Sequence, residues 1–272
     1  MLEPDARDNV YLNLVIKRVL ICKTYRPKFG QPSKSGLSLQ EFQELYAADA
    51  FYSWFGLNDV RIYSAHRAAG GITSLYRQLG IACEELFRQI LIDQLGLSPH
   101  QVKWSYEISK REGGMRRLAL DARIVLSDIV SLGKQETVSY WLGQAMSHLG
   151  IAPAIKQAIQ GTVFEVRQGY KSKDSKQQNA DIANASTAYS QGYLPVVLLL
   201  STQMDNDVME RYERERWLIL QGFTFGDSIS STYTFLKEVI GYDLAAFFQR
   251  NSSTLRAVVG DVLEALLRSN GW

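Results

Sequence analysis

The sequence predicts an α/β (α+β) fold in which a central mixed β-sheet is flanked by helices, with helical additions at both ends of the chain. Three observations lead to this prediction. Apolar residues recur at helical spacing through much of the first third of the chain. The pattern then changes to strong alternation across residues 102–128. Finally, LPVVLLLS at 194–201 has the continuous apolar character of a strand inside a sheet.

Bulk composition excludes several classes of protein. The chain has 272 residues and a formal net charge of +2, which suits one domain of ordinary composition. No run of about 18 apolar residues predicts a membrane span, and the start MLEPDARDNVY lacks the layout of a signal peptide. Cys22 and Cys83 are too few for a disulfide framework, and the three histidines lack zinc-site spacing. We therefore expect a cytoplasmic protein.

The chain is expected to form a single domain over residues 1–272, with three regions. A helical N-terminal region covers 1–73, the core covers 74–201, and a strand with closing helices covers 202–272. No internal repeat or low-complexity tail interrupts them.

The N-terminal region reads as helices separated by turn residues. VYLNLVIKRVLI at 10–21 predicts a first helix, and residues 24–36, with two prolines and two glycines, predict a loop. Ser38 followed by Glu41 fits a capping box for one helix, LSLQEFQELYAADAFYSWF. The glycines of AHRAAGG at 65–71 predict a break before the core.

The core is expected to begin with a long amphipathic helix at 74–96, ended by Gly96. The alternating segment then predicts a β-hairpin with Gly113 and Gly114 at its turn. Alternation in the second strand separates two faces: Ala119, Asp121 and Arg123 on one, and Leu118, Leu120 and Ile124 on the other.

The second half of the core contains the strand TVFEVRQ, preceded by a predicted helix, ETVSYWLGQAMSHLGI. Alternation places Glu165 and Arg167 on one face of this strand, with Phe164 and Val166 opposite. A polar-faced helix is expected over 175–192, ahead of the buried strand.

The C-terminal region is expected to hold one more short strand, WLILQG, and two closing helices. The first of these is STYTFLKEVI, and the second runs from YDLAAFFQ to LEALLRS.

Cationic side chains gather in three runs although the net charge is small. Each run alone is compatible with a solvated face, but together they would attract a polyanion such as nucleic acid. The runs are Lys17, Arg18, Lys23, Arg26, Lys28 and Lys34; Lys110, Arg111, Arg116 and Arg117; and Lys171, Lys173 and Lys176.

The order of elements over residues 74–201 resembles the core of the PD-(D/E)xK nuclease superfamily: helix, hairpin strand, strand with Asp121, strand with Glu165-Val-Arg167, helix and buried strand. The Glu-Val-Arg stretch with its lysine-rich continuation resembles type II restriction endonucleases. The resemblance implies a restriction-endonuclease-like core and Mg²⁺-dependent, sequence-specific cleavage of double-stranded DNA. It also implies a homodimer.

Phosphodiester hydrolysis needs an activated water and relief of the charge on the phosphate. Two carboxylates on adjacent strands, pointing the same way, suit Mg²⁺, a hard cation that prefers oxygen ligands. Asp121 and Glu165 fit these catalytic and metal-binding roles. Glu85 resembles the helix acid that some members of the superfamily add, and Glu84 is its rival for that role.

The third catalytic position departs from the pattern of the superfamily. Arg167 stands where the usual lysine would be, and arginine can stabilise charge but cannot act as a base. Lys171 is the obvious substitute, yet it lies about 20 Å from Glu165 if the strand stays extended. Arg167 is favoured, and Lys171 is kept as a site or DNA-contact residue.

The segment after the strand offers side chains suited to DNA. Lysines bind phosphates and guanine edges, and Gln or Asn can pair with adenine. The proposed DNA-binding residues are Lys171, Lys173, Lys176, Gln177, Gln178 and Asn179.

Three other interpretations remain open. Asp121 could serve only in an ion pair with Arg123 or Arg117. The chain could instead be a repair or recombination nuclease of the same superfamily, which would show no preferred cleavage sequence. It could also be a non-catalytic DNA-binding module, as Arg167 in the lysine position suggests.

Overall fold

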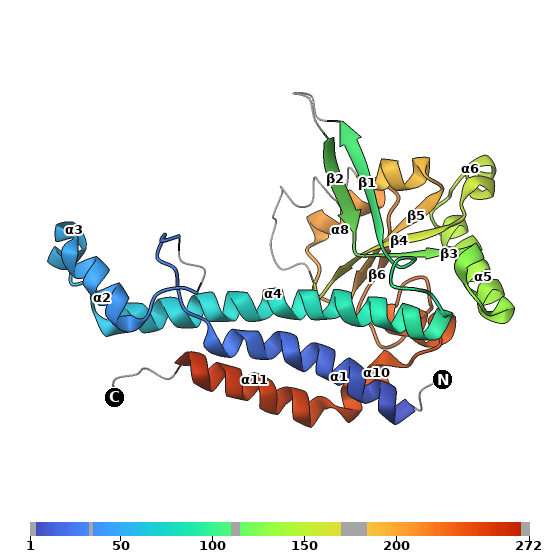
Figure 1. The fold of residues 1–272 in the computed structure, drawn as a ribbon. Coiled ribbons are helices and arrows are strands. Elements are labelled where there is room, and N and C mark those ends of the chain that lie inside the picture. Colours follow the sequence, from blue (N-terminus) through green and yellow to red (C-terminus); the bar gives the residue numbers. More distant parts are fainter. Residues whose placement is uncertain (1–3, 33–34, 110–114, 170–183, 268–272) are drawn as a thin grey trace. The chain divides into compact units, whose positions relative to one another are not determined.

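The computed structural model describes residues 4–32, 35–109, 115–169 and 184–267 (Figure 1). Two compact units make up the chain. Unit 1 comprises residues 1–82 and 250–272, and unit 2 comprises residues 83–249. The division at 82/83 falls within one helix, α4 (Val60–Leu95), which therefore contributes residues to both units.

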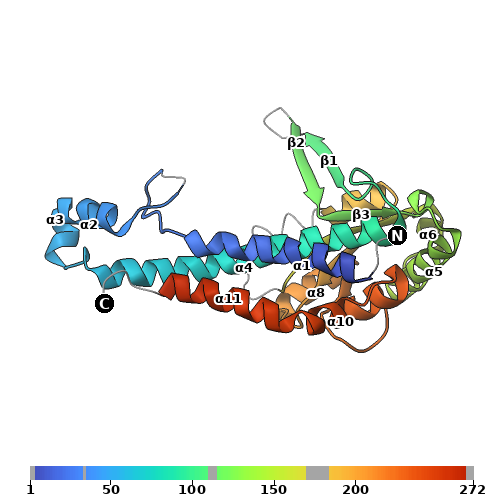
Figure 2. The same ribbon diagram turned by 60° about the horizontal axis from the view of Figure 1, so that its bottom comes forward.

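Unit 1 is helical. Helices α1 and α11 lie side by side (Figures 1 and 2), and the guanidinium of Arg250 donates through Nε to Asp8 of α1 over 3.0 Å. The elements of this unit are α1 (Pro4–Leu20), η1 (Ile21–Thr24), α2 (Leu39–Ala48), α3 (Ala50–Trp54), the first part of α4, and α11 (Ser252–Leu267).

The predicted capping box at the start of α2 is confirmed. The backbone N–H of Ser38 donates to Glu41 over 2.7 Å, and the N–H of Glu41 donates to the Ser38 hydroxyl over 3.2 Å. The single helix predicted to continue through residue 55 is wrong. Asp49 takes extended backbone angles and its carboxylate accepts from the N–H of Tyr52 over 3.2 Å, which starts a separate helix, α3.

The break predicted at 65–71 is also wrong, because α4 continues through both glycines. A Cβ added at Gly70 would lie 2.2 Å from the Tyr25 hydroxyl oxygen, and one added at Gly71 would lie 2.5 Å from the Leu266 side chain of α11. These glycines therefore allow close packing rather than ending the helix. The predicted end at Gly96 is confirmed, since this residue has φ +71° and its N–H donates to the Ile92 carbonyl over 3.1 Å.

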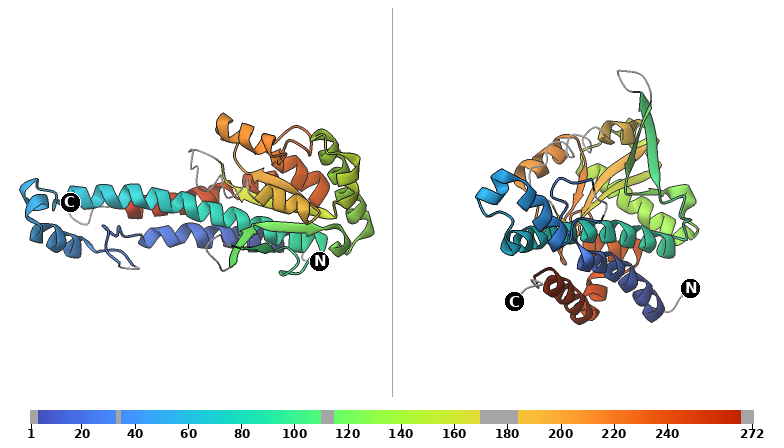
Figure 3. Two further views of the ribbon diagram at one scale, coloured as in Figure 1. Left: turned by 90° about the horizontal axis from the view of Figure 1, so that it is seen from above. Right: turned by 60° about the vertical axis from the view of Figure 1, so that its left-hand side comes forward.

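Unit 2 begins with the end of α4 and an antiparallel ribbon. Strands β1 (Trp104–Ser109) and β2 (Met115–Leu120) pair as the hairpin pattern predicts, and the ribbon extends beyond the main sheet (Figure 3, right). Gly113 and Gly114 lie outside the described residues. The continuous second strand that the alternation predicted is wrong, because it bends at Asp121 and continues as β3 (Ala122–Val125) in a different sheet.

The main sheet has the strand order β3-β4-β5-β6. Strand β3 is antiparallel to β4 (Gly161–Arg167), whereas β4, β5 (Tyr193–Leu199) and β6 (Leu218–Leu220) run parallel. Every residue of β5 is buried, as its apolar sequence predicts for a central strand. The sheet is therefore mixed, and the α+β class is confirmed.

Side chains alternate between two covered faces of this sheet. On one face Phe164 packs edge-on against Phe87 of α4, with ring centres 4.9 Å apart, and near Phe235. On the other, Val163 and Val197 join a cluster that includes Tyr212 and Trp217. The remaining elements of unit 2 are η2 (Leu126–Asp128), α5 (Leu132–His148), α6 (Pro153–Ala158), a helix at 184–190, α8 (Asn206–Arg214), α9 (Thr232–Thr234), the π-helical turn η3 (Phe235–Ile240) and α10 (Leu244–Arg250).

Among the described helices, none is long and apolar enough to cross a membrane.

Candidate active site

The antiparallel pairing of β3 and β4 brings Asp121 next to the segment of β4 that contains Glu165. Ala122, the first residue of β3, pairs with Phe164, and Asp121 immediately precedes it. The N–H of Asp121 donates to the Phe164 carbonyl over 2.8 Å, and the N–H of Val166 donates to Oδ2 of Asp121 over 2.8 Å. Asp121 is thus bonded to the backbone on both sides of Glu165.

The bend between β2 and β3 follows from this use of the Asp121 side chain. A short carboxylate can compete with a backbone carbonyl for an N–H group, and here it accepts the N–H of Val166 in β4. At this point the chain leaves its pairing with β1 and enters the main sheet. The bend thereby fixes the Asp121 carboxylate immediately before the first residue of β3.

Helix α4 adds an acid and a base to the same place. Arg88 donates through Nη1 to the backbone carbonyl of Asp121 over 2.8 Å. Its Nη2 lies 4.0 Å from Oε2 of Glu84, one helical turn away. Arg88 thereby links Glu84 of α4 to the backbone of Asp121.

The pKa values of both carboxyl groups are raised. Burial, followed by the negative charge of Asp121, raises the pKa of Glu84 to about 7, against the opposing charges of Arg88 and Arg167. Burial also raises the pKa of Asp121, against the N–H of Val166 and the same two arginines. When two acids are buried close together, their negative charges are costly, so the pair favours binding a proton or a cation.

Two other titratable groups of unit 2, the Cys83 thiol of α4 and the Tyr233 phenol of α9, are also shielded from solvent. Burial is the main cause that raises the pKa of the Cys83 thiol to about 12 and that of the Tyr233 phenol to about 12. The raised pKa of Glu84, the neighbour of Cys83, therefore reflects a region of low polarity rather than one contact.

Glu165 and Arg167 form an ion pair within β4. Their side chains are 5% and 21% exposed, and the guanidinium contacts Oε1 of Glu165. Residues two apart on a strand share a face. The Glu-x-Arg pattern of the sequence therefore places the two members of this ion pair side by side. It explains how a buried strand can carry two charges, since each compensates the other.

No known family model, curated protein or solved structure matches this chain. The chemistry of the site is therefore inferred from its own geometry.

Of the residues that sequence patterns marked as catalytic, Asp121, Glu165 and Arg167 come together at the β3–β4 junction. Among the described residues no ion pair joins Arg123 to Asp121, and the Nε of Arg123 donates to the Gln101 carbonyl over 3.1 Å. The proposed DNA-contact residues lie outside the described part of the chain: Lys171, Lys173, Lys176, Gln177, Gln178 and Asn179.

The helix acid that Arg88 links to Asp121 is Glu84, the rival of the favoured Glu85. Glu85 is its neighbour on α4, and the charge of Glu85 contributes to the raised pKa of Glu84. Arg88 was missed. A usable signal exists in the sequence, since Glu84 and Arg88 are spaced i,i+4, which places an acid and a base on one face of a helix.

The residues present fit a magnesium ion by the chemistry of their donors. Within the described residues, no group of three or more His, Cys, Asp and Glu side chains is already arranged around a metal position. However, Mg²⁺ keeps several waters and is commonly held by only one or two carboxylates. The carboxylates of Asp121, just before β3, and Glu165, in β4, offer such oxygen donors. The raised pKa values of Asp121 and Glu84 are of the kind that a cation would lower.

Proposed function

We propose that this protein is a Mg²⁺-dependent endonuclease of the type II restriction class, acting on double-stranded DNA as a cytoplasmic homodimer. One observation carries the proposal: Asp121 is hydrogen-bonded to the backbone on both sides of Glu165, and Arg88 links Asp121 to Glu84. Acidic side chains on two adjacent strands and a helix suit a centre that hydrolyses phosphodiesters.

The side chains divide into three roles. Asp121 and Glu165 would hold Mg²⁺, which when bound supplies an activated water and neutralises charge on the phosphate. Glu84, whose pKa is raised to about 7, would exchange a proton near neutral pH, as acid–base catalysis requires. Arg88 and Arg167 bring fixed positive charge to the same place and would offset the charge of a bound phosphate.

Cleavage of plasmid or phage DNA in Mg²⁺, beside gel retardation in Ca²⁺, tests the proposal. We expect discrete bands from the wild type and none from Glu165→Ala, which should bind DNA as well or better because a negative charge has gone. Glu210→Ala is the matched control, since Glu210 pairs on the exposed face of α8 with Arg214. A folded Glu165→Ala protein that cleaves DNA at the wild-type rate would show that Glu165 is not a catalytic residue.

The lysine-rich segment and the unusual arginine are tested in the same assays. Lys171→Ala and Lys176→Ala should weaken binding by roughly 1 kcal/mol or more if they contact phosphates or base edges. Arg167→Lys should retain cleavage, because lysine can keep the charge opposite Glu165 and restores the residue usual in the superfamily. If a folded Arg167→Lys protein lost both DNA binding and cleavage, Arg167 would have a structural role rather than a catalytic one.

DNA affinity should also fall steeply with salt, since each lysine or arginine contact to a phosphate releases counterions. Binding measured at two salt concentrations decides this point, and a flat response would remove the nucleic-acid interpretation.

A second candidate is a non-catalytic DNA-binding module, and the Glu165–Arg167 ion pair favours it. In that pair Glu165 already has a cation, so the carboxylate could be structural. DNA binding that is equal in Mg²⁺ and in chelator, with no cleavage in either, would select this candidate.

A further inference from the structure

Unit 1 contains a recess of about 290 Å³ between the chain after η1 and the first turns of α4. Three cationic side chains line it: Lys23, Arg26 and Arg67. Among its described lining residues there is neither Asp nor Glu. The proposed nuclease chemistry does not use this recess, although Lys23 and Arg26 belong to the first cationic run of the sequence.

Arg26 and Arg67 act on the same point. The phenol of Tyr63 lines the recess, and its hydroxyl donates to the Leu37 carbonyl over 2.9 Å. Burial raises the pKa of Tyr63; the positive charges of Arg67 and Arg26 oppose that shift, and the negative charge of Glu41 adds to it. Arg26, Arg67 and the Tyr63 phenol line the same recess.

The fold holds these cations in position. Gly36 has φ +76°, and a Cβ at this residue would lie 2.2 Å from the backbone oxygen of Arg26. The N–H of Leu37 donates to the Pro27 carbonyl over 2.9 Å, which closes the loop behind Arg26. Arg67 stands within the long helix α4. A ligand would thus meet preformed positive charge, at little cost in ordering the backbone.

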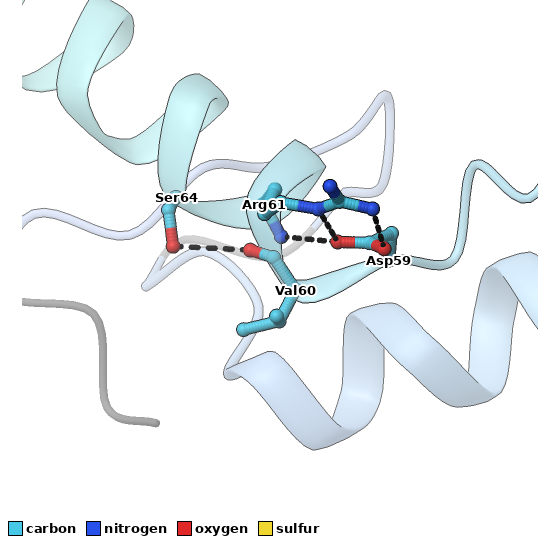
Figure 4. Close-up of polar contacts among 4 residues, drawn as sticks. All are labelled: Asp59, Val60, Arg61 and Ser64. Atoms are coloured by element: carbon cyan, nitrogen blue, oxygen red, sulfur yellow. Dashed lines mark hydrogen bonds and ion pairs between the residues drawn. The ribbon is translucent and has the colours of Figure 1, made fainter. Parts of the chain in front are cut away.

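Hydroxyl groups in the recess have local partners. The Ser64 hydroxyl donates to the Val60 carbonyl over 3.0 Å, within the first turn of α4 (Figure 4). With the Tyr63 hydroxyl also donating to backbone, recognition of an anion would fall to the three cations.

Three acids lie near the recess, but none of them is among its described lining residues. Glu41 lies near Arg26, but the Ser38 backbone and side chain dominate its lowered pKa, as expected for the capping box. Asp59 is chelated by Arg61 just outside the recess (Figure 4). Asp261 comes within 3.9 Å of Lys23, and both of these side chains are at least half exposed.

We propose that this recess binds the phosphate monoester of a nucleotide or of a DNA 5′ end. A dianionic phosphate complements three cations, and guanidinium groups match its oxygens in pairs. A volume of 290 Å³ holds roughly ten waters at about 30 Å³ each, which admits a phosphate with a small substituent but no duplex. The proposal is independent of the nuclease assignment.

Calorimetric titration of the full chain tests it with four probes: inorganic phosphate, adenosine monophosphate, and one oligonucleotide carrying either a 5′-phosphate or a 5′-hydroxyl. Binding of adenosine monophosphate assigns a nucleotide, and preference for the 5′-phosphorylated strand assigns a DNA end. The proposal would be overturned if neither adenosine monophosphate nor the 5′-phosphorylated oligonucleotide bound. It would also be overturned if the two oligonucleotides bound equally and adenosine monophosphate did not bind.

Substitutions locate the binding. Arg26→Gln and Arg67→Gln should each weaken it roughly tenfold or more. Arg61→Gln should change it by no more than about twofold, since it removes the same charge nearby but its guanidinium is committed to Asp59. Equal losses in all three folded variants would show a diffuse charge effect and overturn the site. Glu165→Ala should bind phosphate like the wild type, which separates this result from any failure of cleavage.

Discussion

Two arginine–carboxylate pairs, one in each unit, have the same chemistry and different consequences. Arg61 chelates Asp59 with two hydrogen bonds of 2.9 and 2.7 Å, and their side chains are 78% and 32% exposed (Figure 4). Arg167 contacts Glu165 inside β4, where the exposed fractions are 21% and 5%. Water can solvate either member of the first pair alone. In the second pair, each charge depends on its partner.

The same contrast separates the two proposed sites. At the β3–β4 junction, acids and arginines are close together and partly dry, so protons and ion pairs already balance the charge. In the recess of unit 1, cations converge without an acid among the described lining residues. A site that is balanced internally must rearrange to accept a ligand, whereas cations that line a recess can attract an anion directly.

Breaking the buried pair should have the largest effect on stability. Arg167→Gln leaves Glu165 buried beside a neutral amide, so we expect the free energy of unfolding to fall by about 3 kcal/mol. Urea denaturation at neutral pH measures it.

The double variant Glu165→Gln/Arg167→Gln is the control. It removes both charges and should be more stable than Arg167→Gln alone. A single variant that loses less than about 1 kcal/mol would mean that the pair behaves like an exposed one.

Gly36→Ala should cost about 2 to 3 kcal/mol, the next largest effect. The substitution adds a side chain at φ +76° and forces it against the Arg26 backbone. Gly30→Ala is matched to it, because Gly30 has φ +74° but nothing within 4 Å of an added Cβ. That control should lose only about 1 kcal/mol. Thermal unfolding compares the two, and equal losses would show that Arg26 is not held by this contact.

Glu84→Gln should change how stability depends on pH. The pKa of Glu84 is about 7 in the folded chain and 4.5 in the reference state, so the folded state binds the proton more tightly. Stability must therefore fall as pH rises from about 4.5 through 7 and then level off. Denaturation in chelator at pH 5 and pH 8 should show this decline in the wild type. In the variant the decline should be smaller by about 1 to 2 kcal/mol, the linkage value reduced for partial exposure. Parallel pH profiles would contradict the raised pKa.

The strands of unit 2 were largely predictable, but the bend of the chain at Asp121 was not. Alternation in TVFEVRQ and the apolar run of β5 identify strands because period and burial are local properties. The bend at Asp121 depends on the N–H of Val166, which lies 45 residues away in the sequence. A bond of that range leaves no periodic signal.

Glycine was misread for a related reason. Gly70 and Gly71 resemble a break in the sequence, but their neighbours Tyr25 and Leu266 come from distant segments that pack against α4. In the same way, nothing local indicates that residues 250–272 join the N-terminal helices. Helix ends fixed by adjacent residues, such as the Ser38–Glu41 box, were predicted correctly.

The smallest effect on stability is expected for the Asp59–Arg61 pair, although its hydrogen-bond geometry is good. Asp59 has its pKa lowered to about 2, first by hydrogen bonds from the Arg61 side chain and backbone, yet the pair is open to solvent. Arg61→Gln keeps the backbone N–H that Asp59 accepts at the start of α4 over 2.7 Å, so the carboxylate retains a partner as well as water. The midpoint of thermal unfolding should therefore move by no more than about one degree at moderate salt. Asp59→Ala removes that N-terminal acceptor too and should lower the midpoint further. If Arg61→Gln instead destabilised the chain as strongly as Arg167→Gln, exposure would not be what separates the two pairs.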